Sequence, residues 1–244
     1  GVPYWYKHGH VLEPELFAKS DAVTANSTYL ATLARKHSPH AYYVGQGCDV
    51  ADFDRDKITS VPSDIASIPA PVIGYIGVLY ALRLDLELLH KIATQKPQWN
   101  LVLIGPEDES FRNSPLHGAT NVHFLGRKEA AELPAYLARF DVAINPQKLN
   151  EVTIGNYPRK VDEYLAMGKP TVATDTEAMS IFADYVYLAK TADDYVRLIE
   201  QALAEDTTEK QVQRIDFARL HTWENSVAEI YKAMITAKPE LASS

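Results

Sequence analysis

Cysteine is almost absent from the 244-residue sequence, which contains only Cys48. An internal disulfide and a metal cage built from cysteines are therefore excluded. Long apolar runs are absent as well. No stretch approaches the ~18 uncharged apolar residues that a membrane span requires, and the N-terminal GVPYWYKHGH lacks the apolar core of a signal peptide. These features predict a protein of a reducing compartment and hence a cytoplasmic location.

Positive charge is scarce relative to negative charge. The 24 lysines and arginines face 32 aspartates and glutamates, and the formal net charge is −8 with no basic run to offset it. A nucleic-acid backbone or an anionic lipid surface is therefore not expected as the main partner.

Several catalytic signatures are also missing. No GxGxxG and no P-loop lysine pattern occurs, which argues against dinucleotide-dependent redox chemistry and P-loop phosphoryl transfer. Neither HExxH nor GxSxG occurs, so a zinc-binding helix and a hydrolase triad have no support. His8 and His10 are spaced to touch one metal ion, but no further ligand stands close by, and we predict no metal site.

What the sequence does contain is an alternation of short apolar runs with longer stretches of helical periodicity. The predicted strands are 72–77, 100–105, 122–125, 141–146, 170–174 and 185–189. Strands that are apolar on both faces and alternate with helices predict a parallel sheet covered on both sides. The fold class is therefore α/β, a doubly wound Rossmann-like sheet, with a helical C-terminal segment over residues 191–236.

The domain organisation follows from the segments around this sheet. Residues 1–55 form a smaller piece with strands at 22–25 and 41–44 and a helix capped by Asn26 or Ser27. Residues 56–71, with three prolines, read as a linker. Residues 72–206 form the Rossmann-like domain, and residues 207–244 form helices that return towards the N-terminal part. The abrupt aromatic start, Tyr4-Trp5-Tyr6, indicates a fragment of a longer protein.

The most informative segment is NYPRKVDEYLAMGKPTVAT, residues 156–174. Pro158 suits the first turn of a helix, with Asn156 or Tyr157 as its cap. Gly168 suits a left-handed stop before the next strand. Such a helix N-terminus presents free N–H groups and about half a positive charge, both of which attract phosphate.

Two charged residues of this helix suggest a nucleotide site. Lys160 adds a full positive charge in the first turn, and Glu163 follows on the same face, three residues later. A cation for phosphates and a carboxylate for a sugar diol are what a nucleotide needs. From spacing alone, a surface Lys–Glu pair on an ordinary helix is the alternative.

Residues 121–174, NVHFLGRKEAAELPAYLARFDVAINPQKLNEVTIGNYPRKVDEYLAMGKPTVAT, resemble the nucleotide-binding core of group 1 glycosyltransferases, the large GT-B family of retaining enzymes. Upstream, IGYIG and LRLDLELL match the first strand and helix of that domain, and LVLIGP matches its second strand. Residues 20–36 and 44–54 resemble the family's crossing from the N-terminal to the C-terminal domain. The resemblance covers about residues 20–235 and implies the C-terminal, donor-binding GT-B domain with the end of the N-terminal one.

The resemblance implies a role for each matching position. Glu163 would hold the ribose hydroxyls, Lys160 would lie near the diphosphate, and the loop 150–155 would offer backbone N–H groups to the donor sugar and phosphate. The residues that would bind the donor are Gly77, Gly126, Arg127, Lys128, Gly155, Asn156, Lys160 and Glu163. The residues that would act on the leaving group are Lys160 and Arg83.

Two departures from the family pattern concern this site. The family has a second glutamate eight residues before the ribose-binding one, and Gly155 stands at that position. The usual Arg and Lys pair after the first strand is incomplete, because Arg83 is present but no lysine follows until Lys91. The donor site is therefore either rearranged or degenerate.

The expected function is retaining transfer of a sugar, of the hexosyltransferase type, from a nucleoside diphosphate sugar to an unknown acceptor in polysaccharide biosynthesis. The resemblance implies no cofactor and no protein-held metal, with the nucleotide sugar as substrate. The expected partners are this donor and a missing N-terminal acceptor-binding domain, which would also mediate any peripheral membrane association. The alternatives are a sugar-nucleotide epimerase of the same fold and a non-catalytic module that binds a nucleotide sugar or a protein.

Overall fold

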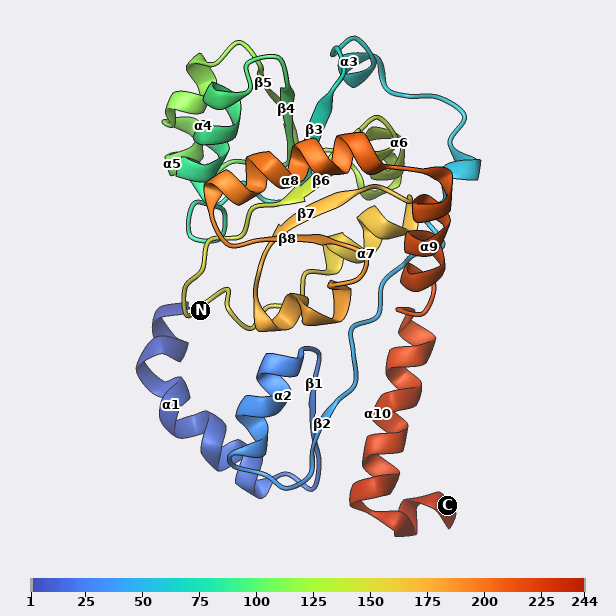
Figure 1. The fold of residues 1–244 in the computed structure, drawn as a ribbon. Helices are drawn as coiled ribbons and strands as arrows, with labels where there is room; N and C mark the ends of the chain where they lie inside the picture. The colour runs from blue at the N-terminus through green and yellow to red at the C-terminus, as the bar shows by residue number, and fades with distance from the viewer. Residues whose placement is uncertain (1, 244) are drawn as a thin grey trace.

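The computed structural model describes residues 2–243, and its largest unit is a six-stranded parallel sheet (Figure 1). Its strands are β3 (Val72–Ile76), β4 (Asn100–Ile104), β5 (Val122–Gly126), β6 (Val142–Asn145), β7 (Thr171–Thr174) and β8 (Tyr187–Ala189). Their order across the sheet is β5-β4-β3-β6-β7-β8, so the chain moves outward from β3 and then resumes on its other side. This places a topological switch point between β3 and β6. The predicted fold class is confirmed.

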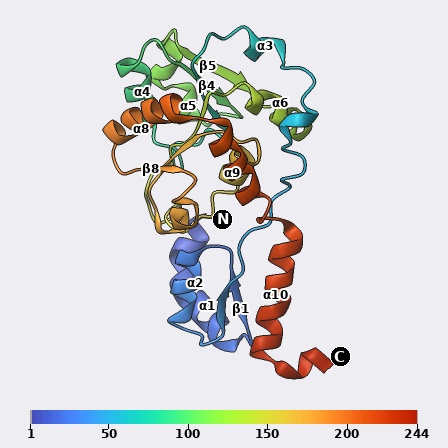
Figure 2. The ribbon, with the colours of Figure 1, turned by 45° about the vertical axis from the view of Figure 1, so that its right-hand side comes forward.

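Helices cover both faces of the sheet (Figures 1 and 2). One face packs against α4 (Leu86–Gln95), α5 (Glu109–Arg112) and α8 (Ala192–Glu205). The other face packs against α3 (Ser63–Ala66), α6 (Leu133–Ala138), α7 (Arg159–Ala166) and α9 (Thr208–Ala218). All five residues of β3 are buried. Because successive side chains of a strand point to opposite faces, this double covering explains the uninterrupted apolar runs in the sequence.

Short 3₁₀ helices fill several connections. They are η1 (Arg55–Lys57), η2 (Pro115–Gly118), η3 (Ala130–Glu132), η4 (Glu177–Phe182) and η5 (Pro239–Ser243). The predicted linker, 56–71, thus contains the end of η1 and the short helix α3 rather than extended chain alone.

A smaller lobe precedes the sheet, and the last long helix lies beside it (Figure 2). Its elements are α1 (Val2–Lys19), β1 (Val23–Ala25), α2 (Thr28–Arg35) and β2 (Ala41–Tyr43), and the long helix is α10 (Trp223–Ala237). β1 and β2 form a separate two-stranded parallel sheet. The Ser27 hydroxyl accepts the Leu30 N–H at 3.2 Å, so the cap of α2 is Ser27 rather than Asn26.

The helix α1 has no counterpart among the predicted elements. Gly9 and Pro14 lie inside it, and both residue types weaken a helical pattern in a sequence. The side chains of Trp5 and Tyr6 lie outside the described residues.

The chain crosses twice between the smaller lobe and the sheet, and the two crossings touch. The Cys48 N–H of the outward crossing donates to the His221 carbonyl oxygen of the return crossing at 3.0 Å, and Cys48 forms a β-bridge with Thr222. A Cβ atom at Gly47 would lie 2.3 Å from the Trp223 ring. The absence of a side chain at Gly47 is therefore required for this contact. We call residues 44–50 and 219–223 the junction.

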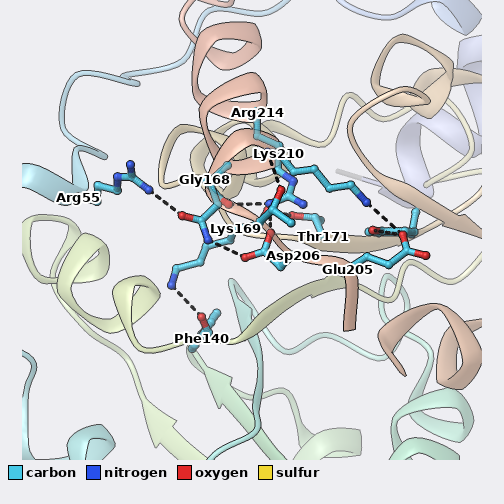
Figure 3. A network of polar contacts seen from close by, with 12 residues as sticks. Arg55, Phe140, Gly168, Lys169, Thr171, Glu205, Asp206, Lys210 and Arg214 are labelled. Atoms are coloured by element: carbon cyan, nitrogen blue, oxygen red, sulfur yellow. Dashed lines mark hydrogen bonds and ion pairs between the residues drawn. The ribbon is translucent and has the colours of Figure 1, made fainter. Parts of the chain in front are cut away.

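A polar network fixes the amino-terminal edge of β7, opposite the edge where ligands bind in such sheets (Figure 3). Lys169 donates from Nζ to the carbonyl oxygens of Ala138 (2.7 Å) and Phe140 (2.8 Å) at the end of α6. Arg214 of α9 donates to the Gly168 carbonyl oxygen at 2.8 Å, and Gly168 has the predicted left-handed backbone, with φ +70°. Burial removes the Lys169 ammonium from water and lowers its pKa to about 8.

The buried Lys169 generates a pH dependence of stability. Between pH 8 and pH 10.5 the folded chain releases the Lys169 proton while the unfolded chain keeps it, so stability rises with pH. We expect the wild type to gain on the order of 3 kcal/mol of unfolding free energy relative to Lys169→Met across this range. Urea titrations of both proteins at pH 7.5 and 10.5 measure this difference. A wild type that loses stability relative to the variant would contradict the assignment.

Candidate functional site

Three glycines at the carboxyl ends of β3, β4 and β5 bring backbone segments into contact. Gly77 donates its N–H to the Ile104 carbonyl oxygen, and Gly105 donates to the Gly126 carbonyl oxygen, both at 2.9 Å. A Cβ atom at Gly105 would lie 1.9 Å from the Gly77 carbonyl oxygen. Gly77 and Gly105 have φ of +149° and +147°, which side chains rarely permit. The edge of the sheet is therefore a backbone surface next to the switch point.

Lys160 lies over this backbone surface. A Cβ atom at Gly77 would be 3.1 Å from Cε of Lys160, and the Lys160 ammonium lies 5.1 Å from the centre of the Tyr75 ring. Within residues 2–243 no carboxylate oxygen pairs with this ammonium at 4.0 Å or less. The structure thus brings two residues predicted for the diphosphate, Gly77 and Lys160, into direct contact and leaves the cation without an acidic partner there.

Glu163 follows one turn deeper in α7. Its side chain is 12% exposed and pairs with Arg159 at 3.3 Å. Burial raises the pKa of Glu163, while the charges of Arg159 and Lys160 oppose that rise. The carboxylate is therefore held beside Lys160 in a mostly buried position, as a group that accepts hydrogen bonds from a diol requires.

The start of α7 differs by one residue from the prediction. Pro158 is the N-cap, with φ −89° and ψ 69°, and the helix begins at Arg159. The predicted caps, Asn156 and Tyr157, both precede it. Pro158 offers no side-chain acceptor for the first-turn N–H groups. The amides of Arg159 and Val161 donate to the carbonyl oxygens of Tyr157 and Pro158, so the amide of Lys160 is the one of these first three that is left for an external anion.

The loop 150–155 is largely closed on itself. Four of its six backbone N–H groups, those of Asn150, Val152, Thr153 and Ile154, donate to acceptors within the loop. The family resemblance implies that this loop gives N–H groups to the donor. Only the amides of Glu151 and Gly155 remain for that role, so the expected contribution of the loop is smaller than predicted.

Gly155 packs against the smaller lobe. Its carbonyl oxygen accepts the Ser27 hydroxyl at 2.8 Å, and a Cβ atom there would lie 2.7 Å from the Tyr29 ring and 3.1 Å from Leu30. The first turn of α2 therefore occupies the space into which a glutamate at this position would extend. This contact gives a steric reason why glycine, rather than the second glutamate of the family, stands at position 155.

Two further loops were predicted to bind the donor. Gly126 and Arg127 are exposed, but the Lys128 ammonium pairs with Asp64 of α3 at 2.7 Å and lies 4.8 Å from the centre of the Tyr136 ring. The hydrogen bond that Lys128 donates to Asp64 raises the pKa of Lys128 to about 12. The Lys128 side chain is therefore held against α3 and α6, so only its backbone is available for binding the donor.

Arg83 is exposed on the loop after β3. Its carbonyl oxygen accepts the Lys148 N–H at 2.8 Å, and Leu84 forms a β-bridge with Gln147. The loops after β3 and β6 are thus joined across the switch point. Arg83 therefore lies near the switch point, where it can act on the leaving group, but no contact joins it to Lys160 in the described part of the chain.

Sequence reasoning missed a buried pair beside the site. Asp162, which is fully buried, accepts a hydrogen bond from Nδ1 of His221 at 2.6 Å. Neither residue was predicted from the sequence to have a role in the site. The two residues are 59 positions apart, and no local pattern predicts such a contact.

The described residues contain no cluster of three or more histidine, cysteine or acidic side chains arranged to hold a metal ion. Among those same residues, no helix has the length and apolarity needed to cross a membrane.

The family model for group 1 glycosyl transferases matches residues 70–205, more than half of the chain. The chain therefore belongs to the group 1 glycosyltransferases. The matched residues contain the backbone surface around Gly77 as well as Lys160 and Glu163.

Individual relatives agree with this family. A protein of Bacillus subtilis, strain 168, described as a candidate teichuronic acid biosynthesis glycosyltransferase, TuaH, is 28% identical over 234 residues, which are 90% of this chain and 58% of that protein. HepE of Anabaena in complex with UDP has a TM-score of 0.70 at 18% identity, covering 89% of this chain and 64% of that chain. Sucrose-phosphate synthase of Thermosynechococcus elongatus has a TM-score of 0.70 at 19% identity, covering 93% and 61%. The chain spans less than two thirds of the length of each, and the two structures share its fold.

The contact between Gly155 and α2 makes a measurable prediction. Gly155→Glu should lower the unfolding free energy by about 1–3 kcal/mol, because the new side chain overpacks against Tyr29. In a Tyr29→Ala background the same substitution should cost less, with a coupling of roughly 0.5–3 kcal/mol. Urea unfolding of the four proteins gives this coupling. Gly118→Glu is the control, since a Cβ atom there meets nothing within 4 Å; equal costs at Gly118 and Gly155, or no coupling to Tyr29, would contradict the steric explanation.

Proposed function

We propose that this chain is the donor-binding part of a retaining GT-B glycosyltransferase, which transfers a sugar from a nucleoside diphosphate sugar to an acceptor. The observation that carries the proposal is the contact of Lys160 with Gly77 at the switch point of the sheet. Ligands of doubly wound sheets bind at such a point. A cation, a helix N-terminus and a backbone surface formed by glycines meet there, which is the chemistry that a diphosphate requires.

The reaction places negative charge on the leaving group. When the bond between the anomeric carbon and the diphosphate oxygen breaks, the electron pair stays on that oxygen. Lys160 and the N-terminus of α7 lie where they would meet this charge, and Arg83 would add a further cation from the loop after β3. Donors that are fixed before the reaction stabilise such charge without reorganising. No cofactor enters this scheme, and no step requires a metal held by the protein.

The neighbouring proteins favour this assignment. HepE was solved with UDP, with UDP and glucose, and with UDP-glucose, so UDP and UDP-glucose are the first donors to test. The relative TuaH is described as acting in teichuronic acid biosynthesis, which supports a role in polysaccharide biosynthesis. A cytoplasmic location stays a prediction from the sequence.

The acceptor would be held by a second Rossmann-like half that packs on the smaller lobe. The lobe has a sheet of only two parallel strands, whereas parallel sheets are normally larger and covered. On α10, Trp223, Val227 and Tyr231 are exposed at four-residue spacing, between 42% and 61%. Exposed apolar stripes of this kind mark interaction surfaces. This half would also carry any peripheral membrane contact.

A non-catalytic module that binds a nucleotide sugar is the second candidate function. Gly155 favours it, because the side chain that contacts the donor sugar in the family is replaced by contact with α2. Slow hydrolysis of bound UDP-glucose would favour an enzyme over this module.

Binding of UDP and uridine separates the roles of Lys160 and Glu163. Lys160→Ala should weaken UDP roughly 10- to 100-fold and uridine little, because a bond to a charged group is worth about 1.5–3 kcal/mol. Glu163→Ala should weaken both, since both contain the ribose. Isothermal calorimetry measures the four affinities.

Lys232→Ala on the exposed face of α10 is the control and should bind UDP like the wild type. Equal losses of UDP and uridine in Lys160→Ala would overturn its assignment to the diphosphate. If the wild type binds none of UDP, GDP, ADP or their sugars, the donor site itself is refuted.

A further inference from the structure

The buried pair Asp162–His221 joins α7, the helix that carries Lys160 and Glu163, to the junction. Asp162 lies in the first turn of α7, between Lys160 and Glu163. His221 lies in the return crossing, directly before α10, and its backbone carbonyl oxygen accepts the Cys48 N–H of the outward crossing. One hydrogen bond of 2.6 Å therefore connects the helix that carries both predicted donor residues to the point where the chain crosses twice.

The surroundings of the pair make it costly to break. Asp162 is fully buried, and an ionised carboxylate in that position needs a donor. An ionised Asp162 only accepts hydrogen bonds, and with it Nδ1 of His221 is the donor. The His221 ring packs edge-on against Phe182 and Phe217, at 5.9 and 4.5 Å between ring centres, so its orientation is fixed by packing as well as by the bond.

The other polar groups around Asp162 do not replace His221. Tyr157 lies beside it, but among the described residues neither the Tyr157 hydroxyl nor Oδ2 of Asp162 has a hydrogen-bond partner. Burial raises the pKa of Asp162, and the hydrogen bond from His221 is the largest influence that opposes this rise. Arg159 acts more weakly on Asp162 and is paired with Glu163. His221 is therefore the principal group that keeps the Asp162 carboxylate in place.

We propose that Asp162 and His221 are positioning residues that hold the first turn of α7, with Lys160 and Glu163, in register with the junction between the two lobes. This inference rests on the proposed donor site. It implies that donor binding and closure of the junction stabilise one another, because linkage between two sites is reciprocal.

The thiol of Cys48 can be used to measure opening of the junction. Cys48 is the one cysteine of the sequence, it is 3% exposed, and it lies within the junction. Burial raises the pKa of its thiol to about 12, with Glu163 adding to the rise. A thiol reagent such as dithionitrobenzoate reaches Cys48 only when the junction opens, so the labelling rate reports opening without any nucleotide.

Two substitutions at His221 separate the hydrogen bond from the packing. His221→Phe keeps a ring between Phe182 and Phe217 but removes the donor, whereas His221→Asn keeps an N–H close to the position of Nδ1. We expect His221→Phe to speed Cys48 labelling roughly tenfold or more and to weaken UDP binding by a similar factor. His221→Asn should restore both to within about threefold of the wild type. UDP should slow labelling in the wild type and have little effect in His221→Phe.

His123→Phe is the matched control. His123 is also partly buried and contacts Asn100 at 2.8 Å, but it lies on β5, away from the junction. Unchanged labelling in His221→Phe, or labelling equal to that of His123→Phe at equal stability, would overturn the proposal. If His221→Asn fails to restore the labelling rate and UDP binding, packing of the ring rather than the hydrogen bond matters, which also overturns the proposal. If UDP, GDP and ADP all fail to bind the wild type, the donor function fails, and the labelling rates still decide whether the pair holds α7 to the junction.

Discussion

The approach of Gly105 to the carbonyl oxygen of Gly77 is the constraint on which the candidate site depends. A Cβ atom at Gly105 would lie 1.9 Å from that oxygen, so at this point the ends of β3 and β4 can meet only through backbone. The contact sets the position of Gly77, and Lys160 packs on Gly77 in turn. A side chain at either glycine would separate the sheet edge from the N-terminus of α7, and the cation would no longer lie over a surface that a phosphate can approach.

The smaller lobe completes this arrangement from the other side. The first turn of α2 touches the loop 150–155 through Ser27 and Tyr29, and the junction touches α7 through His221. The loop and the helix that face the switch point are therefore both held by residues outside the Rossmann-like domain. A ligand that binds between them acts on the relation of the two lobes, because both the loop and the helix contact residues outside the Rossmann-like domain.

The parts of the fold that depend on local pattern could be predicted from the sequence. The double-sided burial of β3 produces an apolar run, and the left-handed turn at Gly168 requires glycine, so both are visible in the residues themselves. The predicted start of α7 was wrong by one residue, because proline is compatible with both the cap position and the first turn. The contact of Gly155 with Tyr29, the pairing of Lys128 with Asp64 and the pair Asp162–His221 join distant segments. Such contacts depend on how the elements pack, and neither spacing nor residue type predicts them.

The bonds already made by the charged residues of α7 determine what remains for a ligand. Glu163 forms an ion pair with Arg159 and Asp162 is hydrogen-bonded to His221, whereas Lys160 lies over the Tyr75 ring. The helix N-terminus adds about half a positive charge. A chain with a formal net charge of −8 can thus present a positive site, because the two acids nearest to the site already have partners. If either partner were lost, a buried carboxylate would act on Lys160 at short range, where a low dielectric strengthens the interaction. The paired acids are therefore as necessary to an anion site here as the lysine itself.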